Sequence, residues 1–165
     1  MTVADTLAVE VTTPCPAWRE ECAQASSFAD QAARLALLRA EAPARAIVGI
    51  TLTDDAAQRA LNLTWRGKDA PTNVLAFPAA DSAVPVPAGA PLLLGDVVLA
   101  FETVRCEAAD QEKPFADHLR HLVVHGVLHL LGYEHTGPAD AAAMEAREIA
   151  ILAELGVPNP YRDTM

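Results

Sequence analysis

Three histidines near the end of the chain have the type and spacing of metal ligands. They lie in the stretch H-G-V-L-H-L-L-G-Y-E-H, which begins at His125 and ends at His135. If the residues up to about Leu131 are helical, His125 and His129 lie on one face, roughly 6 Å apart along the helix axis. Gly132 is suited to end that helix in the left-handed conformation and to turn His135 toward the same ion. Three protein ligands and an open fourth position are typical of a catalytic zinc site, so we predict that His125, His129 and His135 bind one metal ion.

The same spacing matches the metzincin peptidase pattern H-E-x-x-H-x-x-G-x-x-H. The glutamate that serves those peptidases as general base is replaced by Gly126. The sequence therefore keeps the ligand spacing of a peptidase and lacks its base. Three imidazoles also suit Ni, Co or Cu, so the pattern predicts one divalent ion per chain without deciding its identity.

Other polar residues near the histidines are candidates for proton transfer. His121 shares the ligand face of the expected helix and is either an acid/base group, a partner of a ligand, or an ordinary half-buried histidine. Glu134 precedes the third ligand and is placed to hydrogen-bond a ligand or to activate water. Asp96 lies within an apolar strand, and we expect a buried or half-buried carboxylate that orients either a backbone turn or a site histidine.

Length and composition indicate one compact domain spanning residues 1–165. The chain is 52% apolar and has no apolar run of about 18 residues. Its start lacks a secretory signal, and its three cysteines form no C-x-x-C pair, so we expect reduced thiols in a cytoplasmic protein. The net charge of −10 argues against a protein that coats nucleic acid.

Apolar periodicity and breakers predict strands and helices in the order β, α, β, α, β, β, α, α, α. The order of elements favours an α+β or mixed α/β fold, with one small sheet packed on helices and a buried central helix that carries the histidines. Residues 64–71, which include Arg66, look turn-like, and residues 79–91 look like an exposed loop. The expected strands are Thr6–Thr12, Arg45–Thr53, Thr72–Pro78 and Leu92–Phe101, and the expected helices are Ala17–Ala40, Ala56–Leu63, Glu102–Glu112, Phe115–Leu131 and Pro138–Leu155.

Three blocks of this chain resemble the bacterial YbeY family of metal-dependent endoribonucleases, which act in ribosomal RNA maturation. The blocks are the histidine stretch preceded by R-H-L-V-V, the segment L-N-L-T-W-R-G-K-D-A-P-T-N-V-L-A-F-P, and L-L-G-D-V-V-L. They occur in the family's order, and the resemblance covers roughly Asp54 to Tyr161. The family usually has Asp at the position of Glu134, which leaves the three ligands unchanged.

The resemblance implies a small mixed sheet within an α+β fold, with zinc at His125, His129 and His135. It implies a functional Arg66 in the same cleft, where a guanidinium can grip a scissile phosphate, and a cleft wall formed by P-T-N-V-L-A-F-P. The implied activity is zinc-dependent cleavage of single-stranded RNA in ribosomal RNA maturation and ribosome quality control. The implied partner is precursor ribosomal RNA, together with ribosomal proteins or the small ribosomal subunit. No association with a membrane is expected.

Two other functions fit parts of the pattern. A metallopeptidase or other metallohydrolase has the ligand spacing but would need the base that Gly126 lacks. A ribosome-assembly binding factor would use the metal mainly to hold the helix to the following loop, and an acidic protein is suited to bind basic ribosomal proteins.

Overall fold

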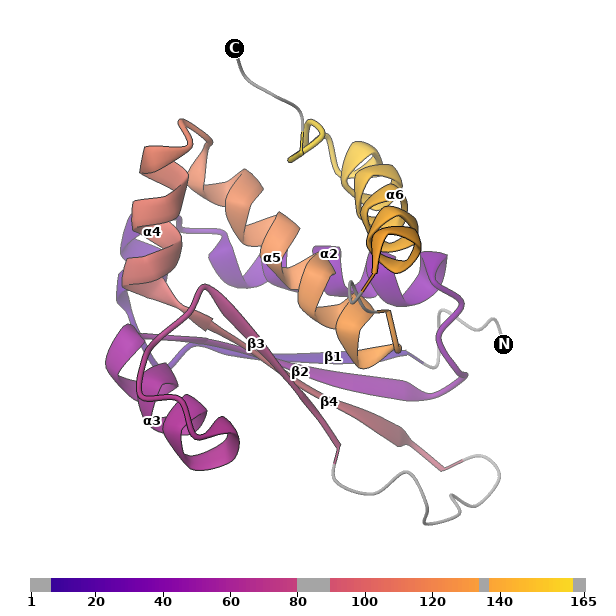
Figure 1. Cartoon of the computed structure of the whole chain (residues 1–165), viewed down its shortest axis with the longest axis horizontal. Helices are drawn as coiled ribbons and strands as arrows, with labels where there is room; N and C mark the ends of the chain where they lie inside the picture. Colours follow the sequence, from indigo (N-terminus) through magenta and orange to yellow (C-terminus); the bar gives the residue numbers. More distant parts are fainter. Residues whose placement is uncertain (1–6, 80–89, 134–136, 162–165) are drawn as a thin grey trace.

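The computed structural model describes residues 7–79, 90–133 and 137–161. These residues form four strands and six helices (Figure 1). In chain order they are β1 Ala8–Thr12, α1 Ala17–Glu21, α2 Ala25–Arg39, β2 Ala46–Thr53, α3 Asp55–Arg66, β3 Val74–Pro78, β4 Leu92–Ala100, α4 Phe101–Asp110, α5 Phe115–Leu130 and α6 Pro138–Glu154.

The strands form a mixed sheet in the order β1-β2-β4-β3. β1, β2 and β4 are parallel, whereas the edge strand β3 is antiparallel to β4. β2 and β4 are the inner strands and the longest two, with eight and nine residues, as suits strands that are paired on both sides. The α+β fold with a small mixed sheet is therefore confirmed.

Helices cover the two faces of the sheet unequally. α2 and α5 pack on one face, with α4 and α6 against α5, whereas α3 lies on the opposite face next to β4 (Figure 1). α5 is the buried central helix that the sequence predicts, since its side chains at Leu119, Val123, Val127 and Leu128 are 0% exposed. The described helices include none that is both long and apolar enough to cross a bilayer.

α5 approaches the sheet closely at Gly126. A Cβ atom added there would lie 2.6 Å from Cγ1 of Val97 on β4 and 3.4 Å from Cγ2 of Val74 on β3. A side chain at this position would push the helix off the strands. The absence of a side chain at Gly126 thus lets α5 lie close to the sheet, and His125 and His129, one turn apart on α5, lie near its edge strand.

Several boundaries differ from those predicted. The helix expected over Ala17–Ala40 is two helices, because Cys22 is extended (φ −147°) and Trp18 anchors α1 separately through a 2.8 Å hydrogen bond from its Nε1 to the carbonyl of Thr53. Asp96 is exposed rather than buried, since its side chain lies over Gly49 on the face away from α5. Most of the loop expected at 79–91 lies outside the described residues.

Candidate metal centre and phosphate cleft

The end of α5 turns as the sequence predicts. Gly132 has φ +99°, in the left-handed region, and its amide donates to the carbonyl of His129 at 3.0 Å. The next amide, of Tyr133, donates to Leu128 at 3.0 Å. This pair of bonds is the Schellman motif, which satisfies the last helical carbonyls and reverses the chain. His135, the expected third ligand, lies outside the described residues, as does Glu134.

His125 and His129 direct their outer nitrogens toward each other. Their Nε2 atoms are 3.1 Å apart, and the rings meet edge to face with centroids 4.6 Å apart. Two imidazole nitrogens bound to one tetrahedral zinc ion at the usual bond length would lie about 3.3 Å apart. The spacing of the two rings therefore fits a shared metal ion.

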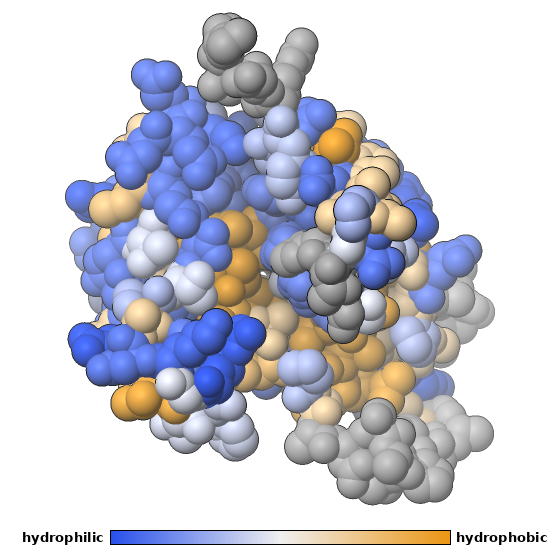
Figure 2. All heavy atoms as spheres, in the orientation of Figure 1, coloured by the Kyte–Doolittle hydropathy of each residue, from blue (hydrophilic) through white to orange (hydrophobic). Residues whose placement is uncertain are grey.

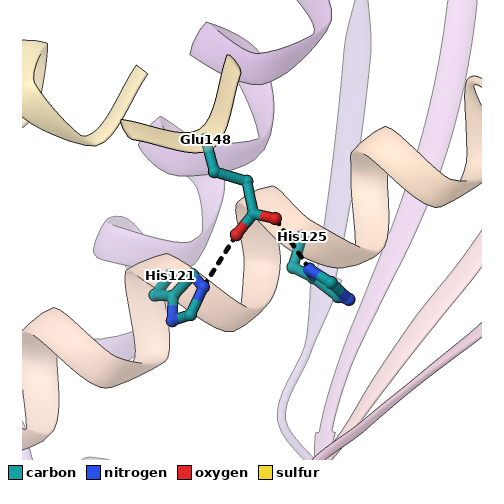
Figure 3. A group of neighbouring side chains, drawn as sticks. All are labelled: His121, His125 and Glu148. Carbon is teal, nitrogen blue, oxygen red and sulfur yellow. Dashed lines mark hydrogen bonds and ion pairs between the residues drawn. The ribbon is translucent and has the colours of Figure 1, made fainter. Parts of the chain in front are cut away.

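A buried carboxylate from α6 holds His125 in this orientation. Figure 3 shows Glu148 reaching between His121 and His125 of α5. Its Oε1 accepts a hydrogen bond from His125 Nδ1 at 3.0 Å, and its Oε2 accepts one from His121 Nε2 at 2.7 Å. The hydroxyl of Tyr161 donates to the same carboxylate at 2.9 Å. Glu148 is 0% exposed, so these donors replace the water it would otherwise bind.

The protonation state of Glu148 decides which nitrogen of His125 carries the proton and which faces His129. Burial raises the pKa of Glu148, but the hydrogen bonds and charges of His121 and His125 outweigh it and hold the pKa at about 2. An ionised carboxylate only accepts, so His125 donates from Nδ1. In the neutral imidazole the Nε2 lone pair then points toward His129, which is the tautomer that binds a metal. Burial and the charge of Glu148 raise the pKa of Tyr161, which keeps its proton for the bond.

A second set of donor atoms shares His125. His121, His125 and Glu148 each offer one possible ligand atom, and these three atoms lie within 4.8 Å of one another. His121 Nε2 and His125 Nδ1 already donate to the two oxygens of Glu148, at 2.7 and 3.0 Å, so both nitrogens carry protons that an ion would have to displace. We therefore infer that Glu148 and His121 position the ring of His125, and that the Nε2 atoms of His125 and His129 are the candidate metal ligands.

Arg66 reaches the site from the opposite face of the sheet. It is the last residue of α3, not part of a turn as predicted, because the left-handed Gly67 (φ +71°) ends the helix one residue later. Buried Gln58 and Asn62 fasten this helix to its surroundings: Gln58 donates to the Val98 carbonyl at 3.0 Å, and Asn62 donates to the Ala70 carbonyl at 2.7 Å. These bonds set the position of Arg66 relative to β3 and β4.

One cleft of about 430 Å³ joins Arg66 to the histidines. Its remaining wall comes from β3, as the resemblance implied for P-T-N-V-L-A-F-P. Arg66 is exposed and forms no ion pair with any residue in the described part of the chain, so its guanidinium is available to an anion. The cleft is lined by Arg66, Val74, Ala76, Pro78, His125, Gly126 and His129.

His121 lies apart from this cleft. It lines a smaller hollow of about 190 Å³ with His118 and residues that precede the C-terminus, and its Nδ1 is buried without a hydrogen-bond partner among the described residues. The geometry connects His121 to His125 through Glu148, and His121 does not line the cleft that contains Arg66.

The chain matches the family model "Endoribonuclease YbeY" over residues 17–156. The chain belongs to the endoribonuclease YbeY family. A YbeY from Paramagnetospirillum magneticum is 52% identical, with 98% of each chain covered, and one from Magnetococcus marinus is 59% identical over 69% of this chain and 82% of its own length. Both relatives carry the name endoribonuclease YbeY.

A solved structure shares the fold of this YbeY family member. The solution structure of a Thermotoga maritima protein superposes with a TM-score of 0.53 and covers 94% of this chain and 99% of its own. At 18% identity this likeness concerns the fold alone.

Sequence reasoning missed Glu148 and Tyr161. A signal for Glu148 was present, because a glutamate stands on the apolar side of α6, one turn after Met144 and one turn before Leu152, both fully buried. A charge at such a position is buried only with partners. Tyr161 follows the last helix and carries no comparable signal.

Proposed function

We propose that this protein is a zinc-dependent endoribonuclease that cuts single-stranded ribosomal RNA precursors during ribosome maturation and quality control. The observation that carries the proposal is the single cleft shared by Arg66, His125 and His129. Membership of a family named for endoribonuclease activity supports the reaction. The proposed setting is the cytoplasm, with ribosomal proteins or the small ribosomal subunit as partners.

His125 and His129 would hold the ion through their Nε2 atoms, with His135 as the proposed third ligand. A bound zinc ion supplies Lewis acidity toward a phosphoryl oxygen and lowers the pKa of coordinated water. The residues of the chain position the ligands. Glu148 keeps His125 in the binding tautomer, and Gly126 lets the helix carry both rings to the edge of β3.

Arg66 would bind and orient the scissile phosphate. A guanidinium can donate two parallel hydrogen bonds to phosphate oxygens, and it stabilises the charge that grows as phosphorus gains a fifth ligand. Its position at a capped helix end, fixed by Gln58 and Asn62, limits the freedom it would lose on binding. For proton transfer we propose Glu134, and we propose that His121 assists through Glu148 rather than by touching the RNA.

The peptidase alternative loses support at Gly126. The position of the peptidase glutamate packs against Val97, where even a Cβ atom has no room. The binding-factor alternative predicts that metal removal destabilises the protein while Arg66→Ala leaves partner binding intact.

Cleavage of a labelled single-stranded RNA by purified protein tests the proposal. We expect cleavage to stop on chelation, to return with zinc, and to be absent in His129→Ala. The metal content of each sample is measured in parallel. Cleavage that persists both in the chelated protein and in His129→Ala would overturn the proposal, and so would metal-dependent cleavage of casein with RNA left intact.

A further inference from the structure

The face of the sheet opposite α5 carries a second hollow, larger than the cleft. It has a volume of about 880 Å³ and lies between α3 and the exposed surface of β3 and β4. We refer to it as the open-face groove. Figure 2 shows apolar surface gathered over the strands in the middle of the molecule, with hydrophilic residues beside it. The groove is lined by Thr51, Leu61, Trp65, Arg66, Ala76, Phe77, Pro78, Ala79, Leu93, Asp96 and Val98.

Large apolar side chains of this groove are exposed to solvent. Trp65 is 71% exposed and Leu93 is 51% exposed, although the chain has a core in which the other tryptophan, Trp18, is completely buried. Exposing a tryptophan ring to water costs free energy that burial would recover. A side chain of this kind at the wall of a groove is typical of a binding site.

The groove is continuous with the cleft that contains Arg66, His125 and His129. Arg66, Ala76 and Pro78 line both hollows, so the two meet across the edge strand β3. Trp65 directly precedes Arg66 in the last turn of α3. A polymer held by its phosphate at Arg66 therefore has its neighbouring residue within the groove.

The charge of the groove favours a neutral occupant. Asp96 is exposed, and its carboxylate lies across Gly49 on the sheet surface. Arg66, at the boundary with the cleft, is the cationic side chain among the described lining residues. A second phosphate would be repelled by Asp96, whereas a nucleobase is neutral and has a flat face that stacks on an indole ring.

We propose that the open-face groove binds a nucleobase of the RNA strand next to the phosphate held by Arg66, with the base stacked on Trp65. This inference rests on the proposed function. It adds a second binding site for the nucleotide: Trp65 binds the base, and Arg66 binds the neighbouring phosphate. Stacking is tolerant of base identity, so the subsite would hold single-stranded RNA without a strict sequence requirement.

Tryptophan fluorescence gives a direct test, because Trp18 is buried and Trp65 is the exposed fluorophore. The probe is a short 2′-O-methyl RNA oligonucleotide, which cannot be cleaved by attack of the 2′-hydroxyl. Its control is an abasic strand with the same number of phosphates. We expect the oligonucleotide to quench the fluorescence of the wild-type protein, the abasic strand to quench little, and Trp65→Phe to show no quenching.

Affinity for the same labelled oligonucleotide, measured by anisotropy, separates stacking from folding effects. We expect Trp65→Ala to weaken binding about tenfold and Trp65→Phe, which keeps a ring, to weaken it less. Leu63→Ala is the matched control, because Leu63 is 50% exposed on the same helix and does not line the groove. It should bind like the wild type, and all variants should bind the abasic strand equally.

Equal binding of the oligonucleotide by Trp65→Ala and wild type would overturn the subsite. Self-association of the wild type that Trp65→Ala abolishes, with no quenching by the oligonucleotide, would assign the groove to a second copy of the chain and would also overturn it. These readouts need no cleavage. If the wild-type protein does not cleave RNA but the oligonucleotide quenches its fluorescence, the proposed function fails and the subsite stands. If the wild-type protein cleaves RNA but its fluorescence is not quenched, the subsite fails and the proposed function stands.

Discussion

One carboxylate organises the polar side of the histidine site. Glu148 accepts hydrogen bonds from His121, His125 and Tyr161, and it comes from a helix that follows the histidine motif in the chain. The ligand residue types could be read from their spacing, because i and i+4 positions of a helix share a face. The support from Glu148 could not, because it depends on how α6 packs against α5.

Replacing Glu148 by Gln should weaken zinc binding by about 10- to 100-fold. The amide keeps the volume but cannot accept from both His121 and His125, so His125 loses the bond that selects its metal-binding tautomer. Competition with a chromophoric chelator measures the affinity. Glu154→Gln is the control, because Glu154 is an exposed carboxylate of the same helix paired with Arg39. Equal zinc affinity in both variants would refute the positioning role of Glu148.

At the scale of elements, the approach of α5 to the sheet depends on Gly126. Gly126→Ala gains helix propensity of about 1 kcal/mol but places its methyl against Val97. Overpacking a tight contact costs about 1–3 kcal/mol, so we expect net destabilisation by about 1 kcal/mol in urea denaturation.

The strand side of this contact supplies the control. Val97→Ala removes the methyl groups that a Cβ at position 126 would meet. In that background Gly126→Ala should no longer destabilise, and the double-mutant cycle should show a coupling of more than about 0.5 kcal/mol. Additive effects would show that the helix and strand do not touch there as described.

The contact between α4 and α5 should make stability depend on pH. Burial lowers the pKa of His118, although the carboxylate of Glu107 opposes this and His121 and Lys113 reinforce it. Below the ordinary value of 6.5 the unfolded chain binds a proton more readily than the folded one. The stability that the neutral ring contributes is therefore complete above that pH and is lost as the pH falls toward the folded pKa.

Urea denaturation of metal-free protein on both sides of pH 6.5 measures this loss. His118→Gln keeps a neutral donor toward Glu107 without a titrating ring, so it should lose less stability than the wild type on acidification. All other residues are the same in the two proteins, so the difference between the two losses reports on position 118. An equal or larger loss in the variant would contradict the assignment.

Element types were largely readable from the sequence, whereas some boundaries were not. Apolar alternation located all four strands, and caps and breakers located the helices from α3 to α6. Arg66 was placed in a turn because the polar end of α3 lacks apolar periodicity. The helix nevertheless continues to Arg66, because the Gly67 amide donates back to the Leu63 carbonyl and the Asn62 side chain donates forward to the Ala70 carbonyl. The break between α1 and α2 depends on Trp18, whose partner Thr53 is distant in the sequence.

At the scale of the molecule, an acidic protein of net charge −10 presents few cations to RNA. Arg66 is the arginine or lysine among the described residues that line the cleft and the open-face groove. The affinity for single-stranded RNA should therefore fall only gently with salt, with a slope of log K against log salt of about −1 to −2. Titrations over a range of salt concentrations measure the slope, and a value steeper than about −4 would reveal a basic surface elsewhere.

The two halves of the site could be predicted from the sequence, but their position relative to each other could not. The histidine spacing and the resemblance around Arg66 were visible in the sequence, but their meeting across β3 depends on α5 and α3 lying on opposite faces of the sheet. The roles of His135 and Glu134 stay predictions, since both lie outside the described residues.

The most direct test of the shared site is the single-turnover cleavage rate of a defined single-stranded RNA by Arg66→Ala. Metal content is measured on the same sample, and Arg59→Ala, which removes an exposed arginine of the same helix that pairs with Asp69, is the control. We expect Arg66→Ala to lose about 100-fold in rate or more with unchanged metal content, and Arg59→Ala to keep the wild-type rate. A rate for Arg66→Ala equal to that of Arg59→Ala would contradict a site built from Arg66 and the histidines.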